Sequence, residues 1–384
     1  MGDKKKISLK YILKNTYLFL RKTILKIMVM PQAVSKINPA DVGSVVAIRI
    51  DRIGDVVVSL PALKALKEIF PQSHLAVVIK ESNIALVKNV PWIDEAIPYR
   101  GFRQVLGILH KKGFSMAIDL LMDYSLKTAL LVFLSRAKVK VGFDIQGRGR
   151  FFNVTTAPSL EKKQMSKHLL DLVRLVAGVS HIDKEKIKDT IPELFVSEED
   201  KAYANDFLKK HGVQDKDVIF GVHPGGWFPS QRWPLERFAQ LAEGLSRKYN
   251  AKIVVMGSSH EKKLLDTFVQ VMKIKPIMVI GFTLDKLAAI IAQTGIVIAN
   301  NSGLLHIAAA LRKPTVSIMG PTDPYLWWPQ GDNQLVIRHT LGCSPCSLGS
   351  CKKHSCMLSI SVEEMEKAVE GLISNIAKKP FKNA

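Results

Sequence analysis

Cysteine is scarce in this 384-residue chain, and acidic residues are outnumbered. All four cysteines fall between positions 343 and 356. That clustering excludes a disulfide framework spanning the chain and favours a reducing, cytosolic compartment. The 34 Asp and Glu residues are set against 55 Lys and Arg residues, which gives a net charge of +21. Such an excess calls for an acidic partner: nucleotide, nucleic acid, anionic lipid or a phosphorylated glycan.

Long apolar runs are also missing. No run approaches 18 residues, so a membrane-spanning helix is not expected. The N-terminus lacks the apolar core and small-residue cleavage site of a signal peptide, so export is not expected either. The apolar content of 47% is that of a globular protein, and the length suffices for two α/β domains.

A basic, periodic stretch covers residues 4–28. Apolar residues recur there at spacings of three and four with lysines and arginines between them, which predicts an amphipathic helix. Such a helix can lie in an anionic membrane surface, and the alternative is that it packs its apolar side on the protein body. Pro31 and Pro39 then mark a linker.

From residue 44 the pattern alternates strand and helix, which predicts parallel sheets covered on both faces. The first series has expected strands at 45–50, 75–80, 96–99, 116–120 and 140–143, with helices at 60–70, 102–112 and 125–135. Ser59 would cap the first of these helices and Pro61 would lie in its first turn. The second series has expected strands at 218–222, 253–257, 277–280, 296–299 and 315–319, with helices at 235–248, 261–272, 284–293 and 303–311.

The charged segment 180–216 lacks buried strands and contains a predicted helix at 198–210, so we place the domain junction there. The expected divisions are an extension and linker (1–38), a first Rossmann-like domain (39–195) and a second (196–360). A C-terminal helix (361–384) would pack back toward the first domain. Two doubly wound domains in series would face each other across a central cleft at the carboxyl ends of their strands.

Asp55 and Gly54 follow the first buried strand, at the edge where open α/β sheets hold ligands. Gly54 lets a ligand approach the backbone, and Asp55 could accept a proton from a bound hydroxyl. The alternative for Asp55 is that it caps the helix that follows. Because the turn has no GxGxxG pattern, a nicotinamide-binding domain of the usual kind is disfavoured.

Three strand ends of the second domain carry turns suited to a nucleotide. HPGGWFPSQRWP (223–234) offers Gly225 and Gly226 for close approach and Arg232 for a diphosphate. MGSSHEKK (256–263) places Gly257 before Glu261, which could hold ribose hydroxyls or could be an ordinary helix-start glutamate.

The third turn lies in IVIANNSGLLHIAAAL (296–311), where a strand runs through a polar turn into a helix. The free amides and dipole of that helix would bind an anion, unless Ser302 merely caps it.

These motifs together resemble glycosyltransferase family 9, the heptosyltransferases of the lipopolysaccharide inner core. The residues that carry the resemblance are GD-x5-P (54–61), HPGG (223–226), RWP (232–234), GSSHE (257–261), NNSGLLH (300–306), GPTDP (320–324) and CSPC…C…CM (343–357). The resemblance implies the two-domain GT-B fold, inversion at the anomeric carbon, no metal requirement and, usually, ADP-heptose as donor. The first domain would then bind the acceptor and the second the nucleotide sugar.

Carried over by position, the resemblance implies that Asp55 is the general base. Arg232 takes the place of the basic diphosphate ligand, and Glu261 falls near the acidic ribose ligand. Ser302, Gly303 and Leu304 match the phosphate-binding turn, with His306 beside it. At the family's Asp in N-D-[ST]-G this chain has Asn301, which keeps the size and hydrogen bonding of that side chain and removes its charge.

A phosphorylated, lipid-linked glycan is the implied acceptor, and it would meet cations of the first domain. The candidates are Arg52, Arg136, Arg148 and Arg150, with Lys138 and Lys140 nearby, and the alternative is a generally basic surface. Cys343, Cys346, Cys351 and Cys356 could hold a structural zinc ion.

The sequence therefore predicts a cytoplasmic enzyme, peripheral on the inner face of a bacterial inner membrane, that moves heptose or a similar sugar. No nucleic acid is an expected partner, because no RNA-binding signature accompanies the charge. The rivals are a GT-B transferase for another sugar nucleotide or glycan, and a non-catalytic basic membrane- or nucleic-acid-binding protein.

Overall fold

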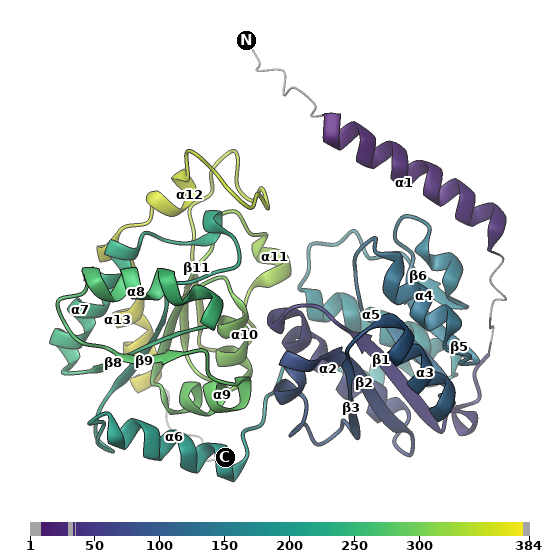
Figure 1. The fold of residues 1–384 in the computed structure, drawn as a ribbon, viewed down its shortest axis with the longest axis horizontal. Helices are drawn as coiled ribbons and strands as arrows, with labels where there is room; N and C mark the ends of the chain where they lie inside the picture. The colour runs from purple at the N-terminus through teal and green to yellow at the C-terminus, as the bar shows by residue number, and fades with distance from the viewer. Residues whose placement is uncertain (1–8, 30–33, 35, 379–384) are drawn as a thin grey trace.

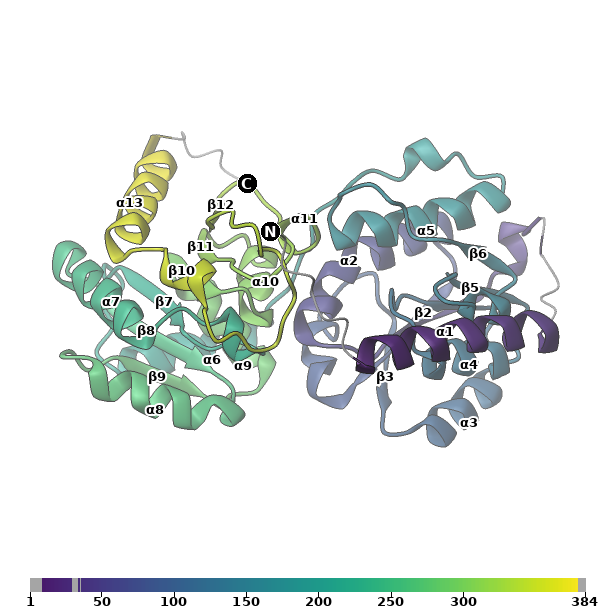
Figure 2. The same cartoon turned by 90° about the horizontal axis from the view of Figure 1, so that it is seen from above.

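The protein folds as two α/β domains that lie side by side, with one long helix over the first (Figures 1 and 2). The structure is a computed structural model and describes residues 9–29, 34 and 36–378. Each domain is built on one parallel sheet, as the alternation of strand and helix predicted, and each sheet has six strands where five were expected.

The first sheet has the strand order β3-β2-β1-β4-β5-β6. Its strands are β1 Ser44–Arg49, β2 His74–Lys80, β3 Glu95–Tyr99, β4 Met116–Asp119, β5 Val139–Phe143 and β6 Val154–Thr156. The helices of this half are α1 Leu9–Met28, α2 Ile53–Ile69, α3 Phe102–Lys112, α4 Leu126–Leu134 and α5 Met165–Val179, with 3₁₀ turns η1 Pro39–Asp41, η2 Glu81–Leu86, η3 Arg148–Phe151 and η4 Lys184–Lys186. Alternate residues of β1 face opposite layers: Val45 and Ala47 pack with α2 and α5, and Val46 and Ile48 pack with α3 and α4.

The second sheet has the strand order β12-β11-β10-β7-β8-β9. Its strands are β7 Ile219–His223, β8 Lys252–Gly257, β9 Ile277–Ile280, β10 Ile296–Asn300, β11 Thr315–Ile318 and β12 Gln334–Ile337. The helices are α6 Glu198–Lys210, α7 Leu235–Tyr249, α8 Lys262–Val271, α9 Leu284–Gln293, α10 Gly303–Ala310, α11 Pro324–Trp327, α12 Ser355–Leu358 and α13 Val362–Lys378, with 3₁₀ turns η5 Pro229–Gln231 and η6 Ser259–Glu261. β7 lies between β8 and β10, so the three nucleotide-friendly turns leave neighbouring strands at one edge.

Helix α2 begins seven residues earlier than the sequence predicted. It starts at Ile53, so Asp55 lies in its first turn and Pro61 lies in its interior. Ser59 caps nothing, because its hydroxyl donates to the Val56 carbonyl. The physical reason is burial: α2 packs against α5 and α10, and this tertiary contact outweighs the cost of an internal proline.

Two elements of the first domain were missed, and one helix was misplaced. β6 and α5 follow the strand at which the expected series closed. The last helix, α13, does not pack toward the first domain. It lies against α7, β11 and β12 of the second domain, and its Glu370 pairs with Lys248 of α7. The apolar stripe that contains Met365, Val369 and Leu372 completes that domain's core.

Helix α1 is fastened to the first domain by one buried arginine. Arg21 donates from Nη1 to the carbonyl oxygen of Tyr124 (2.7 Å) and from Nη2 to that of Gln146 (2.8 Å). Leu18 is buried beside it, so one side of α1 packs on the protein body, as one of the two alternatives proposed. Residues 4–8 of the expected helix lie outside the described part of the chain.

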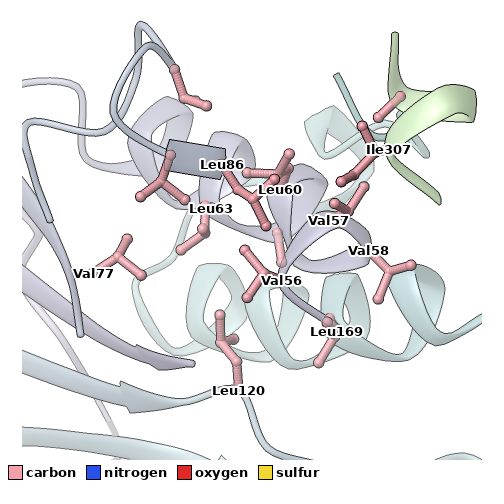
Figure 3. Packing of buried hydrophobic residues seen from close by; sticks show 14 of the residues in the cluster. Val56, Val57, Val58, Leu60, Leu63, Val77, Leu86, Leu120, Leu169 and Ile307 are labelled. Atoms are coloured by element: carbon pink, nitrogen blue, oxygen red, sulfur yellow. The ribbon is translucent and has the colours of Figure 1, made fainter. Parts of the chain in front are cut away.

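The two domains share an apolar contact between α2 and α10. Figure 3 shows Ile307 of α10 beside Val57 of α2. Val58 of α2 and Leu169 of α5 lie on the neighbouring side of α2. All four side chains belong to one buried cluster that crosses from one domain to the other. The carboxyl edges of the two sheets are thereby held against each other.

Candidate active site

The carboxyl end of β1 presents an arginine between two aspartates. Arg49 is the last residue of the strand and is 1% exposed. Its Nη1 lies 3.3 Å from Oδ2 of Asp51, and its Nη2 lies 3.6 Å from Oδ1 of Asp55. Asp55 also accepts a long hydrogen bond from the Arg52 amide (3.4 Å), so the capping interpretation of Asp55 is partly right. About a fifth of each aspartate side chain is exposed, which leaves both within reach of a ligand.

The turn that carries Asp55 touches the helix that carries the expected phosphate site. A Cβ on Gly54 would lie 3.0 Å from Cδ2 of His306. A Cβ on Gly303 would lie 2.8 Å from the Cβ of Ile53. Both glycines are therefore required by close approach of the two domains rather than by an unusual backbone conformation. The proposed base and the start of α10 are neighbours because of this contact.

His306 is buried at the same contact, with its ring edge-on to Trp327 (6.0 Å between centroids). Burial lowers the pKa of His306 to about 4, and the nearby Asp55 carboxylate opposes that shift only in part. The imidazole is therefore neutral at pH 7, and it offers a diphosphate no positive charge.

Ser302 precedes α10 but does not cap it with its side chain. Its hydroxyl is bonded instead to Nδ1 of His223 (3.0 Å) at the end of β7. The amides of the first turn of α10 are thus not taken by the serine, which contradicts the simple capping alternative. A helix of this kind offers an anion unpaired N–H groups and a positive dipole end. Asn301 makes no side-chain hydrogen bond to any residue that the structure describes.

Glu261 is held by its own surroundings. Its Oε1 accepts from the Gly226 amide (3.0 Å) and its Oε2 from the amide and hydroxyl of Ser258 (2.9 and 2.8 Å). Nε2 of His223 lies 3.3 Å from Oε1. Burial opposes ionisation, but these hydrogen bonds and the histidine together hold the pKa of Glu261 well below its usual range. Glu261 therefore shapes the turn, and contact with a ribose would require one of these bonds to exchange.

The Gly225–Gly226 turn is tied down from two sides. Arg232 donates from Nε and Nη2 to the carbonyl of Gly226 (2.9 and 2.8 Å). Nδ2 of the buried Asn300 donates to the carbonyls of Pro224 and Gly225 (2.9 Å each). A Cβ on Gly225 would lie 2.1 Å from Oε1 of Glu261, so any larger residue there would displace the Glu261 carboxylate. Nη1 of Arg232 has no hydrogen-bond partner among the described residues and remains for an anionic ligand.

The remaining members of the predicted donor set are Gly257 and Leu304. Gly257 ends β8, and a Cβ on it would lie 2.5 Å from Cδ1 of Leu265. Leu304 is buried in the first turn of α10, so it can offer a ligand only its amide. The structure thus gathers the predicted donor residues of the second domain at one edge of its sheet, and Gly54 of the first domain faces them at His306.

The predicted acceptor cations do not form one group. Arg52 lies over the Trp227 ring of the second domain (4.4 Å to the centroid), close to Asp55. Arg136 precedes β5 and so lies at the opposite edge of the first sheet, together with Lys138. Lys140 donates to the carbonyl of Ala137, and Arg150 makes no side-chain hydrogen bond to the described residues.

For Arg148 the acceptor prediction is wrong. Its side chain is fully buried and forms an ion pair with the equally buried Asp119, while its Nη1 bonds Asp123 (3.1 Å). A guanidinium enclosed in this way cannot meet a glycan.

The four cysteines form no disulfide, and three of the side chains are exposed. Cys356 is buried beside Gly320 and Met357. Across the described ranges, no group of three or more His, Cys, Asp or Glu side chains is placed to hold a metal ion. The zinc hypothesis therefore gains no geometric support.

Sequence reasoning missed Arg49, Asp51, His223 and Asn300. All four lie in or directly after a strand whose carboxyl end was already singled out. For Arg49, His223 and Asn300 the available signal was a polar residue at the end of an apolar strand, because a buried polar side chain needs a partner. Asp51 lies in the polar turn that follows β1 and gave no such signal.

Comparison with known proteins gives a consistent result. The sequence model of glycosyltransferase family 9 (heptosyltransferase) matches residues 102–356. Lipopolysaccharide heptosyltransferase 2 of Salmonella typhimurium strain LT2 is 26% identical over 343 residues, which cover 84% of this chain and 96% of the relative.

Two solved structures share the fold. The glycosyltransferase family 9 protein of Veillonella parvula has a TM-score of 0.76 and 24% identity, and the match covers 90% of this chain and 99% of that one. ADP-heptose lps heptosyltransferase II of E. coli has a TM-score of 0.73 and 23% identity, with 87% and 99% covered. The two-domain architecture is GT-B, as predicted.

Proposed function

Because the chain belongs to glycosyltransferase family 9, we propose that it transfers heptose, or a similar sugar, from an ADP-sugar to a lipopolysaccharide inner-core acceptor. The similarity to lipopolysaccharide heptosyltransferase 2 supports the sugar and the acceptor, and the similarity to the ADP-heptose lps heptosyltransferase II of E. coli supports the ADP donor. The observation that carries the proposal is the contact of Gly54 with His306 and Gly303. That contact sets Asp55 beside the start of α10, where a diphosphate would bind.

The donor half of the site supplies positive partners for a leaving diphosphate. Arg232 offers Nη1, and the first turn of α10 offers unpaired amides and the positive end of its dipole. Both would stabilise the charge that develops on the β-phosphate as the anomeric C–O bond breaks. We propose that these groups do so without a metal ion.

The acceptor half supplies the base. An acceptor hydroxyl would attack the anomeric carbon from the face opposite the diphosphate while Asp55 takes its proton, which inverts the configuration. An oxocarbenium-like transition state is expected, as in glycoside hydrolysis. Domain closure would align the two substrates and exclude water that would otherwise hydrolyse the sugar nucleotide.

The proposal is tested by incubating the purified protein with ADP-heptose and a core acceptor that lacks this sugar. We expect mass spectrometry to show a product that is one heptose heavier than the acceptor. NMR of that product should show that the anomeric configuration is inverted relative to the donor. An isothermal titration with ADP should show binding, and Arg232→Ala should weaken it. Hydrolysis without transfer, or transfer only from a uridine or guanosine diphosphate sugar, would contradict the proposal.

We also propose that the enzyme works at a membrane surface, held there by α1. Among the described residues, no helix is both long and apolar enough to span a bilayer. Five apolar residues form a stripe along one side of α1, and they are more than half exposed: Leu13, Tyr17, Leu20, Ile24 and Ile27. They recur at spacings of four and three, so they share one face of the helix. Leu18 lies off this face, and Arg21 borders it, with its guanidinium 5.8 Å from the centre of the Tyr17 ring. An exposed apolar stripe on a helix that also carries Lys22 and Lys26 fits an anionic lipid surface.

Replacing Leu20 and Ile24 by Asp should release the protein from anionic vesicles. Each buried aliphatic side chain contributes roughly 1.5–3 kcal/mol, so losing two should weaken binding by about 10²-fold or more. Co-sedimentation with phosphatidylglycerol vesicles measures the effect. Asn15→Asp with Thr23→Asp is the matched control: it adds the same charge to exposed positions of the same helix outside the stripe. Equal loss in both double variants would mean that charge alone binds the surface.

A further inference from the structure

The guanidinium of Arg49 is shared by two carboxylates. Nη1 faces Asp51 and also donates to the carbonyl of Leu120 (2.5 Å), while Nε donates to the backbone carbonyl of Asp55 (2.9 Å). These two backbone bonds fix the plane of the guanidinium. It cannot turn wholly toward either aspartate side chain.

One nitrogen of this guanidinium has no hydrogen-bond acceptor among the described residues. Nη2 is buried and has no hydrogen-bond partner, and the Oδ1 atom of Asp55 lies 3.6 Å away, beyond hydrogen-bond distance. A buried N–H without a partner is costly, so Nη2 favours any movement that brings the Asp55 carboxylate closer. Asp55 is therefore attracted by Arg49 but not fully bound to it.

Asp51 lies in a region with an excess of carboxylates. Asp55 faces it from α2, Asp119 from the end of β4 and Asp123 from the loop that follows β4. The second buried arginine, Arg148 of η3, is already paired with Asp119 and Asp123. Arg49 is therefore the cation that Asp51 and Asp55 have in common. η2 contributes Asn83, which donates to the backbone carbonyl of Asp51 (3.3 Å) and brings no charge.

Burial is the main cause of the unusual titration of Asp51. It raises the pKa of this carboxyl to about 6, Arg49 opposes the shift, and the three neighbouring carboxylates add to it. Asp51 thus changes charge within the range in which a cytoplasmic enzyme works, and it does so against the same guanidinium that faces Asp55.

We propose that Asp51 is a positioning residue that tunes the proposed base by competing with Asp55 for Arg49. When Asp51 is ionised, Arg49 is divided between two carboxylates, and Asp55 remains basic enough to take the acceptor's proton. When Asp51 is protonated, only the Asp55 carboxylate still attracts Arg49, and by moving closer to Nη2 Asp55 becomes a weaker base. This inference rests on the proposed function only for its kinetic readout.

The proposed sugar transfer needs no reactant other than the acceptor and the ADP-sugar. The acceptor O–H bond breaks as its oxygen bonds to the anomeric carbon, and the proton goes to Oδ of Asp55. The anomeric C–O bond to the diphosphate breaks with its electron pair on the departing oxygen. Asp51 exchanges protons with solvent, and Arg49 stays charged throughout.

Two measurements test the inference. In the first, the 13Cγ shift of Asp55 is followed against pH in the full chain labelled at aspartate, with Asp55→Asn used for assignment. We expect Asp55 to report the ionisation of Asp51 as an inflection near pH 6, which disappears in Asp51→Asn. This readout needs no sugar transfer, so it remains decisive if the proposed function is wrong.

The second measurement is the pH profile of kcat. In the wild-type enzyme kcat should rise through about pH 6. In Asp51→Asn this rise should disappear and kcat at pH 8 should fall roughly tenfold, with the KM for the ADP-sugar unchanged. Asp123→Asn is the matched control, since it removes a nearby, half-exposed carboxylate and should keep the rise. Arg49→Lys keeps a cation at this position. The pH profile of its kcat should retain an inflection, at a pH that differs from the wild-type value of about 6.

Two outcomes would overturn the inference. One is an Asp55 shift that does not respond to Asp51→Asn. The other is an Asp51→Asn enzyme with the wild-type pH profile. A merely structural Asp51 would lower the thermal midpoint and leave the profile unchanged.

Discussion

Asp55→Asn should lower the rate of sugar transfer by about 10²–10⁴-fold, the range that a positioned general base contributes. The amide has the size of the carboxylate but cannot take a proton from the acceptor hydroxyl. Affinity for the ADP-sugar should stay within a few-fold, because the donor turns lie on the second domain and Asp55 makes no hydrogen bond to them. Single-turnover kinetics and calorimetry with ADP measure the two effects separately.

Arg232→Ala is the contrasting control for Asp55→Asn. It removes a guanidinium that supports the Gly226 turn and offers Nη1 to the diphosphate, so the affinity for ADP should fall. If Asp55→Asn transferred sugar at the wild-type rate, the base would have to be sought elsewhere, with Asp51 as the nearest carboxylate on the same arginine. If it lost ADP affinity as well, the change would have disturbed the domain contact at Gly54.

Arg148→Met should destabilise the protein by about 3–5 kcal/mol, because it leaves the fully buried Asp119 without its cation. Denaturant unfolding at pH 7 measures the loss. The double variant Arg148→Met with Asp119→Leu should recover much of it, since no unpaired charge then remains. Arg150→Met is the matched control from the same 3₁₀ helix, and it should change stability by less than about 1 kcal/mol.

The stability of the Arg148→Met variant should depend on pH. Burial already raises the pKa of Asp119 in the folded protein, and removal of Arg148 would raise it further. The folded state then binds a proton more tightly than the unfolded state, so stability should increase as the pH falls from 7 toward 5. A variant whose stability is independent of pH would show that Asp119 is not left buried and unpaired.

The layered architecture was predictable from local sequence. Runs such as VVAIRI and IVIAN are apolar because both faces of a parallel strand are covered, and their spacing with helices of 3.6-residue period specifies doubly wound domains. The predicted bounds of α3, α6 and α9 match the structure, because glycine or a polar residue flanks each helix at both ends. α2 does not match: its apolar residues run through Pro61, and only packing against α5 and α10 determines where it begins.

The site was predictable where a strand end by itself indicates a ligand. Gly54, Asp55, Gly225 and Gly303 were singled out from the turns that contain them, and the structure shows the three glycines in contacts that admit no side chain without displacing a neighbour. Ser302 was less predictable. Whether it caps its helix depends on His223, which lies 79 residues away in the chain and on a neighbouring strand.

By itself, the sequence determined the fold class, the family and the edge of each sheet at which the chemistry lies. These depend on periodicity and short motifs, which are properties of adjacent residues. Only the tertiary structure decided which cations are free to meet a ligand and which are paired with carboxylates inside the protein. The sequence predicts Arg148 as a surface cation, but in the structure it is paired with Asp119 and Asp123. The sequence indicates only that Arg49 ends a strand, but in the structure its guanidinium lies between Asp51 and Asp55. The physical reason is that a buried charge is stable only beside its partner, and the fold alone brings the two together.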